Sequence, residues 1–245
     1  MTYCVGILLD AGLVCLSDSR TNAGVDHINS FRKLNVFERL GDRVLILMTA
    51  GNLAITQSLV SMLQEQMNAP DTRPSLWNVP NLFEAARHVG ETLREVHRRD
   101  AEALQAFGIE FSASLILAGQ IRGEAPRLFN IYAAGNFIEA TPETPYFQIG
   151  ESKYGKPIVD RVLRRSTSLD EAVKCALISM DSTIRSNLSV GLPLDLAIVR
   201  TDALHLDSHR SIDAGDPYFS MVRTRWGEAL RRAFEDMPNP DWSAR

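Results

Sequence analysis

The sequence has few cysteines, and the three present, Cys4, Cys15 and Cys175, form no pattern. An odd, scattered set is neither a disulfide framework nor a zinc site, which fits a reducing compartment. The five histidines show no metal-ligand spacing, and the sequence contains no phosphate-binding loop or dinucleotide fingerprint. We therefore expect a protein that needs no metal and no organic cofactor.

Long hydrophobic runs and an excess of positive charge are also missing. No apolar stretch reaches the ~18 residues that a membrane helix needs, and no charged segment with an apolar run behind it marks a secretory signal. The formal net charge is −4, which argues against a general nucleic-acid or acidic-membrane surface. These absences predict a cytoplasmic protein that binds neither nucleic acid nor a membrane.

What is present is the composition of an ordinary globular chain, with 45% apolar and 23% charged residues in a length of 245. We expect one domain over residues 1–245. The patterns give blocks in the order strands, two helices, strands, two helices, strands and a helix. Segregated blocks favour antiparallel sheets packed together with helices outside, so the expected fold is α+β, a four-layer αββα sandwich. A closing strand pair is expected over 194–200 and 203–208.

Thr2 is the first candidate for chemistry. Removal of Met1 would leave a hydroxyl nucleophile a few bonds from a free α-amine, which can take the hydroxyl proton directly or through a water. An α-amine has an ordinary pKa of ~7.7–8.0, so a useful neutral fraction exists near neutral pH. Many proteins begin with Met-Thr, so this feature gains weight only from its neighbours.

Asp18 is the second candidate, at the end of an apolar strand. A three-residue loop over 10–12 would pair Leu9 with Leu13 and Cys4 with Asp18. Thr2 and Asp18 would then lie diagonally on one face, roughly 7–8 Å apart at the backbone. A two-residue loop would instead move Asp18 to the opposite face. The expected gap suits one cation between the two side chains.

Lys33, which enters an apolar run, is the candidate for that cation. Beside Thr2 it would favour the ionised hydroxyl and lower the pKa of the amine, while Asp18 holds it in place. Arg32 is the competing choice, but a guanidinium stays charged and tunes protons poorly. Gly51 completes the set at a strand-to-helix junction, where a backbone N–H can stabilise an oxyanion.

These residues resemble the proteasome β-subunit family in order and near spacing: Thr2, the run from Asp18 to Gly24, Lys33-Leu34 and Ala50-Gly51. The opening Met-Thr-Tyr-Cys-Val-Gly and the stretch over 185–193 are more narrowly similar to the bacterial Anbu group of that family. The resemblance covers essentially the whole chain. It implies the αββα fold, maturation to a terminal threonine, and a self-compartmentalising homo-oligomer, as a ring or a helical assembly.

Two positions depart from the family pattern. Glu151 stands where the family has a serine near the nucleophile, although Ser152 could shift into that role. The family's Asp-x-x-Ser corresponds here to Ser186 through Ser189, so Ser189 carries over and the supporting aspartate does not. Because supporting residues fix the geometry of a site, weak or narrow activity is expected.

The leading interpretation is a threonine-type peptidase or amidohydrolase, with Thr2 as nucleophile, Lys33 and Asp18 as its tuning pair, Gly51 at the oxyanion and Ser189 in support. Its substrate would be a peptide or related amide. The alternatives are an amidase or transpeptidase acting on a small or branched amide, and a catalytically silent assembly scaffold. No feature of the sequence specifies an ATP-dependent partner.

Overall fold

The computed structural model describes residues 1–23, 27–69 and 73–242. Gly24, the last residue of the run that carries the family resemblance near Asp18, lies outside the described residues. The order of elements in the described ranges follows the expected blocks: strands, two helices, strands, two helices, strands and a helix.

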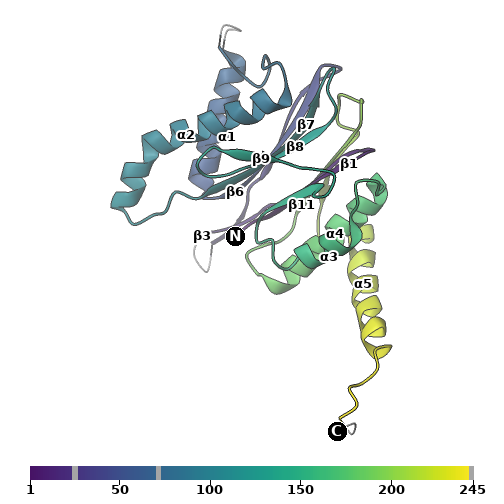
Figure 1. Cartoon of the computed structure of the whole chain (residues 1–245). Helices are drawn as coiled ribbons and strands as arrows, with labels where there is room; N and C mark the ends of the chain where they lie inside the picture. The colour runs from purple at the N-terminus through teal and green to yellow at the C-terminus, as the bar shows by residue number, and fades with distance from the viewer. Residues whose placement is uncertain (24–26, 70–72, 243–245) are drawn as a thin grey trace.

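Two five-stranded antiparallel sheets form the centre of the molecule (Figure 1). The first contains, in spatial order, β10 (Tyr146–Gly150), β1 (Tyr3–Leu9), β2 (Gly12–Asp18), β11 (Leu194–Arg200) and β12 (Ser208–Ile212). The second contains β5 (Leu34–Arg39), β6 (Arg43–Gly51), β7 (Ala113–Ile121), β8 (Arg127–Ile131) and β9 (Phe137–Glu139). A separate short hairpin joins β3 (Arg20–Ala23) to β4 (His27–Ser30).

The helices cover the outer faces of the two sheets. On the second sheet lie α1 (Leu53–Asn68) and α2 (Leu82–Ala106), and on the first lie α3 (Lys156–Val162), α4 (Leu169–Ser186) and α5 (Pro217–Glu235). The α+β, four-layer αββα prediction is therefore confirmed. Within the described ranges, no helix combines the length and apolar character that crossing a bilayer requires.

Three apolar clusters separate the four layers. Alternate side chains of each inner strand point to opposite faces, so β1 sends Cys4 between the sheets and Val5 toward α4. The cluster between the sheets also contains Leu13, Ile46 and Ile116. Burial on both faces explains why β1 and β2 read as continuous apolar runs, and each fully buried aliphatic side chain contributes about 1.5–3 kcal/mol.

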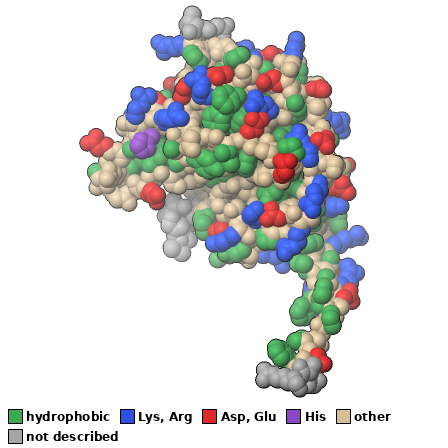
Figure 2. Space-filling model, in the orientation of Figure 1, with side chains coloured by type: hydrophobic (Ala, Val, Ile, Leu, Met, Phe, Trp, Pro, Cys, Tyr) green, Lys and Arg blue, Asp and Glu red, His purple; other side chains and the backbone are tan. Residues whose placement is uncertain are grey.

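Helix α5 leaves the body of the molecule and carries the end of the chain away from it (Figure 1). The N-terminal part of α5 is attached to α4, because Arg223 binds the buried carboxylate of Asp181 at 2.7 Å. Beyond that point large apolar side chains are exposed, and Figure 2 shows them along the projecting end. They are Leu230 at 52%, Phe234 at 80%, Met237 at 67% and Trp242 at 82% exposure.

The expected hairpin register is wrong by one residue. The structure pairs Leu9 with Gly12 and Cys4 with Ser17, so the loop has two residues and not three. Gly12 adopts φ +142°, and a Cβ there would lie 2.1 Å from the carbonyl oxygen of Val199. This glycine-only conformation allows the tighter turn.

The expected closing strand over 203–208 is also wrong, because β12 begins only at Ser208. The residues before it form a loop held by distant contacts. The N–H of Leu206 donates to Glu38 on β5 at 2.7 Å, and Leu204 has a positive φ of 52°.

Candidate functional site

A cleft of about 680 Å³ opens where the first residues of the chain meet the ends of β6 and β10. Both elements end there in a glycine with positive φ, which lets the backbone turn away and leaves space. The residues around the cleft are Met1, Thr2, Thr21, Asn29, Phe31, Ala50, Gly51, Asn52, Leu53, Ser112, Ser114 and Gly150.

Thr2 is fixed in this cleft by the end of β10. Its carbonyl oxygen accepts the N–H of Glu151 at 2.7 Å, and only 8% of the residue is exposed. A Cβ at Gly150 would lie 1.9 Å from the same oxygen, so only glycine permits this approach. Met1 also lines the cleft and is 64% exposed.

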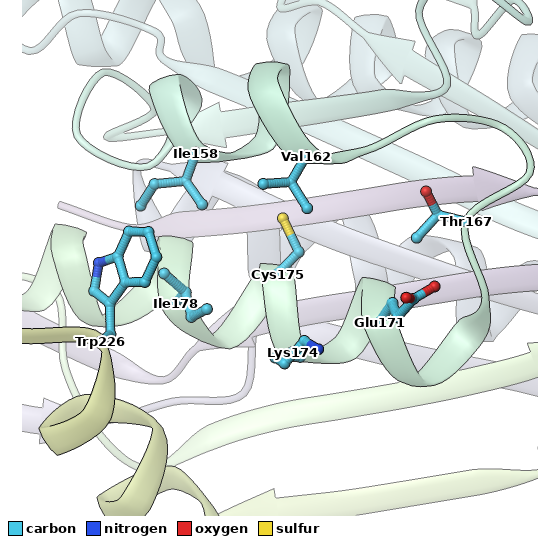
Figure 3. Close-up of a pocket in the computed structure, with 8 residues that line it drawn as sticks. All are labelled: Ile158, Val162, Thr167, Glu171, Lys174, Cys175, Ile178 and Trp226. Atoms are coloured by element: carbon cyan, nitrogen blue, oxygen red, sulfur yellow. The ribbon is translucent and has the colours of Figure 1, made fainter. Parts of the chain in front are cut away.

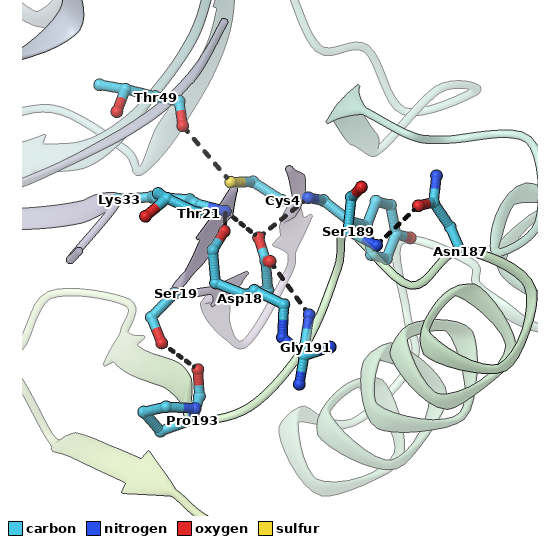
Figure 4. Close-up of polar contacts among 12 residues, drawn as sticks. Cys4, Asp18, Ser19, Thr21, Lys33, Thr49, Asn187, Ser189, Gly191 and Pro193 are labelled. Atoms are coloured by element: carbon cyan, nitrogen blue, oxygen red, sulfur yellow. Dashed lines mark hydrogen bonds and ion pairs between the residues drawn. The ribbon is translucent and has the colours of Figure 1, made fainter. Parts of the chain in front are cut away.

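Asp18 and Lys33 form a buried ion pair beside these first residues (Figure 4). Lys33 Nζ lies 2.7 Å from Asp18 Oδ1, and the two residues are 4% and 0% exposed. The same oxygen accepts the N–H of Tyr3 at 3.0 Å. Because Lys33 and Tyr3 share one acceptor atom, the ammonium group lies next to the start of β1 and does not face solvent.

Asp18 lies beside the start of β1, as expected, but a different strand pairing places it there. It does not pair with Cys4, but it is the last residue of β2, and its carboxylate reaches the N–H of Tyr3 across the strand end. Gly191 N–H donates to its second oxygen at 3.2 Å. Burial raises the pKa of Asp18, whereas the Lys33 ammonium and these hydrogen bonds oppose the shift.

Lys33, and not Arg32, supplies the cation at this position. Arg32 is exposed at the surface, while Lys33 turns inward at the start of β5 and also donates to the carbonyl oxygen of Arg20 at 2.6 Å. Burial and the Lys33 ammonium lower the pKa of the α-amine of Met1, while Asp18 and Glu151 oppose that shift. A lowered pKa leaves more of an amine neutral, and only a neutral amine can accept a proton.

Gly51 stands at the junction that the sequence predicts. It ends β6 with φ +115°, and Asn52 caps α1 by accepting the N–H of Ala54 at 3.0 Å. A Cβ on Gly51 would lie 2.3 Å from the carbonyl oxygen of Ser112, so a side chain is sterically excluded. The open cleft therefore borders backbone and the positive end of a helix.

Ser189 belongs to a segment that follows α4 and lies against Asp18 (Figure 4). Its N–H donates to Asn187 Oδ1 at 2.9 Å. Asn187 Nδ2 in turn donates to Glu151 Oε2 at 2.9 Å. Asn187 thus connects Glu151, one of the two positions that depart from the family pattern, to Ser189, whereas Ser186, the other departing position, and Ser152 take no part in this connection.

Sequence reasoning missed the roles of Asn187 and Gly191. Both lie in the stretch over 185–193 that carries part of the family resemblance, but no local pattern marks either one. Their partners are distant: Gly191 binds Asp18 173 positions away, and Asn187 binds Glu151 36 positions away. Only the folded chain brings these groups together.

A second cavity, of about 190 Å³, lies between α3, α4 and α5 (Figure 3). Its walls are mostly apolar, and Cys175 is the nucleophilic side chain that points into it. Burial raises the pKa of this thiol to about 11, so it stays protonated and unreactive at neutral pH. Within the described ranges, no three His, Cys, Asp or Glu side chains are grouped to hold a metal ion.

The chain resembles known proteins over most of its length. A family model described as "Proteasome subunit" matches residues 2–199. A proteasome subunit beta of Haloferax volcanii is 22% identical over 213 residues, which cover 86% of this chain and 79% of the relative.

Two solved structures are closer in sequence. Anbu (ancestral beta-subunit) from Yersinia bercovieri is 54% identical with a TM-score of 0.92, covering 98% of this chain and 100% of that chain. The helical assembly of the Anbu complex from Pseudomonas aeruginosa is 49% identical with a TM-score of 0.94, covering 99% and 100%.

Proposed function

Because the chain belongs to the proteasome subunit family, and within it to the Anbu group, we propose that it is a threonine-type peptidase or amidohydrolase. Its nucleophile is the Thr2 hydroxyl, after an aminopeptidase has removed Met1. The buried Lys33–Asp18 pair beside the start of β1 is the observation that carries this proposal. Burying such a pair is costly. A positive charge at that place favours the ionised form of a neighbouring hydroxyl and lowers the pKa of a neighbouring amine.

The reaction begins when the Thr2 oxygen attacks the carbonyl carbon of an amide in the cleft. The hydroxyl proton passes to the α-amine of Thr2, directly or through a water, and the Lys33 ammonium favours the ionised oxygen. The N–H of Gly51, beside the N-terminus of α1, stabilises the negative oxygen of the tetrahedral intermediate. Ser189 supports the amine from the segment that binds Asp18.

The intermediate collapses as the carbon–nitrogen bond breaks. The leaving amine takes the proton from the α-ammonium, and the acyl group stays on Thr2 as an ester. A water then attacks the ester carbonyl, gives its proton to the α-amine, and releases a carboxylic acid with the threonine hydroxyl restored. Each step needs only the groups named and water.

The decisive experiment combines intact mass with an active-site probe. Mass spectrometry first shows whether Met1 is absent. A peptide epoxyketone, which reacts with both the hydroxyl and the amine of a terminal threonine, is then expected to add once per processed chain. Thr2→Ala should abolish the adduct, and Thr2→Ser should retain it.

Thr201→Ala is the matched control, because that threonine lies at the opposite end of β11 from the cleft. A processed protein that forms no adduct would refute the catalytic proposal and favour the scaffold. Product analysis with peptides and small amides separates peptidase from amidase or transpeptidase activity.

We also propose that the chain assembles with copies of itself. The 49% identical Pseudomonas aeruginosa protein forms a helical assembly, and α5 projects with exposed Phe234 and Trp242 that a lone chain leaves in water. Light scattering coupled to size exclusion should give a mass of several chains. Phe234→Asp with Trp242→Asp should reduce that mass if α5 contributes an interface, and a monomeric unmodified protein would refute assembly.

A further inference from the structure

Glu151 carries a carboxylate that is buried beside the N-terminus, and the mechanism above does not use it. The residue is 8% exposed. Its recorded partners are Asn187 Nδ2 at 2.9 Å from Oε2 and Lys153 Nζ at 3.4 Å from Oε1. Lys153 is itself 69% exposed. A buried carboxylate is costly unless it is well paired, and one neutral amide with one solvated ammonium provides modest compensation.

The neighbours of Glu151 place its carboxylate next to the start of the chain. Its own N–H binds the carbonyl oxygen of Thr2 at 2.7 Å. The Asn187 nitrogen that donates to the carboxylate also lies 3.8 Å from the sulfur of Met1. Removal of Met1 takes this side chain away and creates a new positive charge at the nitrogen of Thr2.

Asn187 is not free to turn away from Glu151. Its Oδ1 accepts the N–H of Ser189, which directs its Nδ2 toward the carboxylate. The same segment continues to Gly191, whose N–H binds Asp18. The segment after α4 therefore binds two carboxylates, Asp18 with its lysine and Glu151 beside the first residues of the chain.

We propose that Glu151 is a positioning residue: held by Asn187, its carboxylate binds the α-ammonium that removal of Met1 leaves on Thr2. The inference rests on the proposed function only in that it requires the terminal threonine. It deepens that proposal by giving the base of the reaction a fixed partner at a position where the family has a serine.

The charge balance at the amine follows from the groups that face it. For the α-amine of Met1, burial and Lys33, just before β5, lower the pKa, whereas Asp18 at the end of β2 and Glu151 after β10 raise it. The same charged groups surround Thr2, the next residue, so we expect the same signs at its amine. Lys153 reduces the effect of Glu151 through their contact at 3.4 Å. Because Glu151 favours the protonated amine, it moves the onset of catalysis to higher pH.

The test measures the amine itself, without any substrate. Processed protein is acylated with an N-hydroxysuccinimide ester over a range of pH, and the modified N-terminal peptide is quantified by mass spectrometry. Glu151→Gln keeps the size of the side chain and removes its charge. We expect the pKa of the α-amine to fall by about one unit, so that acylation well below that pKa becomes up to about tenfold faster.

Two further variants keep the result interpretable. Asn187→Ala releases the carboxylate and should give a smaller fall in the same direction, and it carries the test if Glu151→Gln does not fold. Glu102→Gln, an exposed glutamate on α2, should leave the titration unchanged. An amine with the same pKa in Glu151→Gln and unmodified protein would overturn the inference, as would a chain that retains Met1.

Epoxyketone addition to the same variants separates a failure of the catalytic proposal from a failure of the Glu151 inference. If the amine titrates as expected but no epoxyketone adds to Thr2, the proposed function fails and the inference stands. If adducts form with the same pH dependence in Glu151→Gln and unmodified protein, the proposed function stands and the inference falls.

Discussion

Replacing Lys33 by methionine should destabilise the protein strongly, because it leaves the Asp18 carboxylate buried at 0% exposure without a cation. Removing one partner of a buried ion pair typically costs about 3–5 kcal/mol. For a chain of this length each kcal/mol lowers the melting temperature by about 2–4 °C, so a fall of about 6–20 °C is expected. The backbone N–H groups of Tyr3 and Gly191 still bind the carboxylate, which favours the lower part of that range.

The dependence of this loss on pH identifies its cause. Without Lys33, the pKa of Asp18 in the folded state rises further above its unfolded value of ~3.9. A group with a raised pKa in the folded state favours folding when it is protonated. The deficit of Lys33→Met should therefore be full at about pH 8 and shrink as the pH falls through the folded-state pKa.

The assay is urea unfolding followed by circular dichroism at one fixed protein concentration, since assembly would otherwise shift the midpoint. Lys174→Met, an exposed lysine on α4, is the matched control and should change the free energy of unfolding by less than about 0.5 kcal/mol. The double variant Lys33→Met with Asp18→Asn should recover part of the loss. A single variant as stable as the parent, or equally unstable at all pH values, would refute the buried pair as its cause.

Three further results are expected. Gly51→Ala should lower the free energy of unfolding by more than about 1 kcal/mol in urea titration, because its Cβ meets the Ser112 oxygen at 2.3 Å, and it should slow epoxyketone addition; an unchanged midpoint would contradict the strained φ. Asp181→Ala should expose α5 to limited proteolysis, since Arg223 loses its partner at 2.7 Å, while Asp100→Ala, on the exposed end of α2, should not. Burial raises the pKa of Cys175 to about 11, so a thiol reagent should modify the folded protein slowly at pH 8 and all three cysteines after unfolding.

The block order of the fold could be predicted because its signals are local. Ser168 accepts the N–H of Glu171 and its own N–H binds that glutamate's carboxylate, so the start of α4 follows from four adjacent residues. The junction at Gly51 and Asn52 is similarly local. Such patterns join residues within one helical turn, so they can be recognised in the amino-acid sequence.

The hairpin register and β12 could not be predicted, because distant residues decide them. The turn before Gly12 is tight because that glycine packs against Val199 of β11, far along the chain. The delay of β12 to Ser208 depends on Glu38, which binds the loop from the other sheet. Periodicity carries no information about either contact.

For the candidate site, the sequence identified the charged pair but not its surroundings. Asp18 was expected from a wrong pairing, and it still meets Lys33 because it ends β2. Lys33 was preferred to Arg32 because a guanidinium stays charged and tunes protons poorly. In the structure it is the lysine that is buried. Asn187 gave no signal, because its importance comes from Glu151, a contact that exists only after α4 has packed.

The close approach between Thr2 and Gly150 has a practical consequence for producing the protein. Glu151 and Gly150 hold the Thr2 carbonyl in place and Met1 lines the 680 Å³ cleft, so a purification tag placed ahead of Met1 would begin inside that cleft. Such a tag would also deny the aminopeptidase its recognition of a free methionine. Preparations meant for activity or inhibitor work should begin at Met1, or carry a leader that a protease trims to leave Thr2 as the first residue.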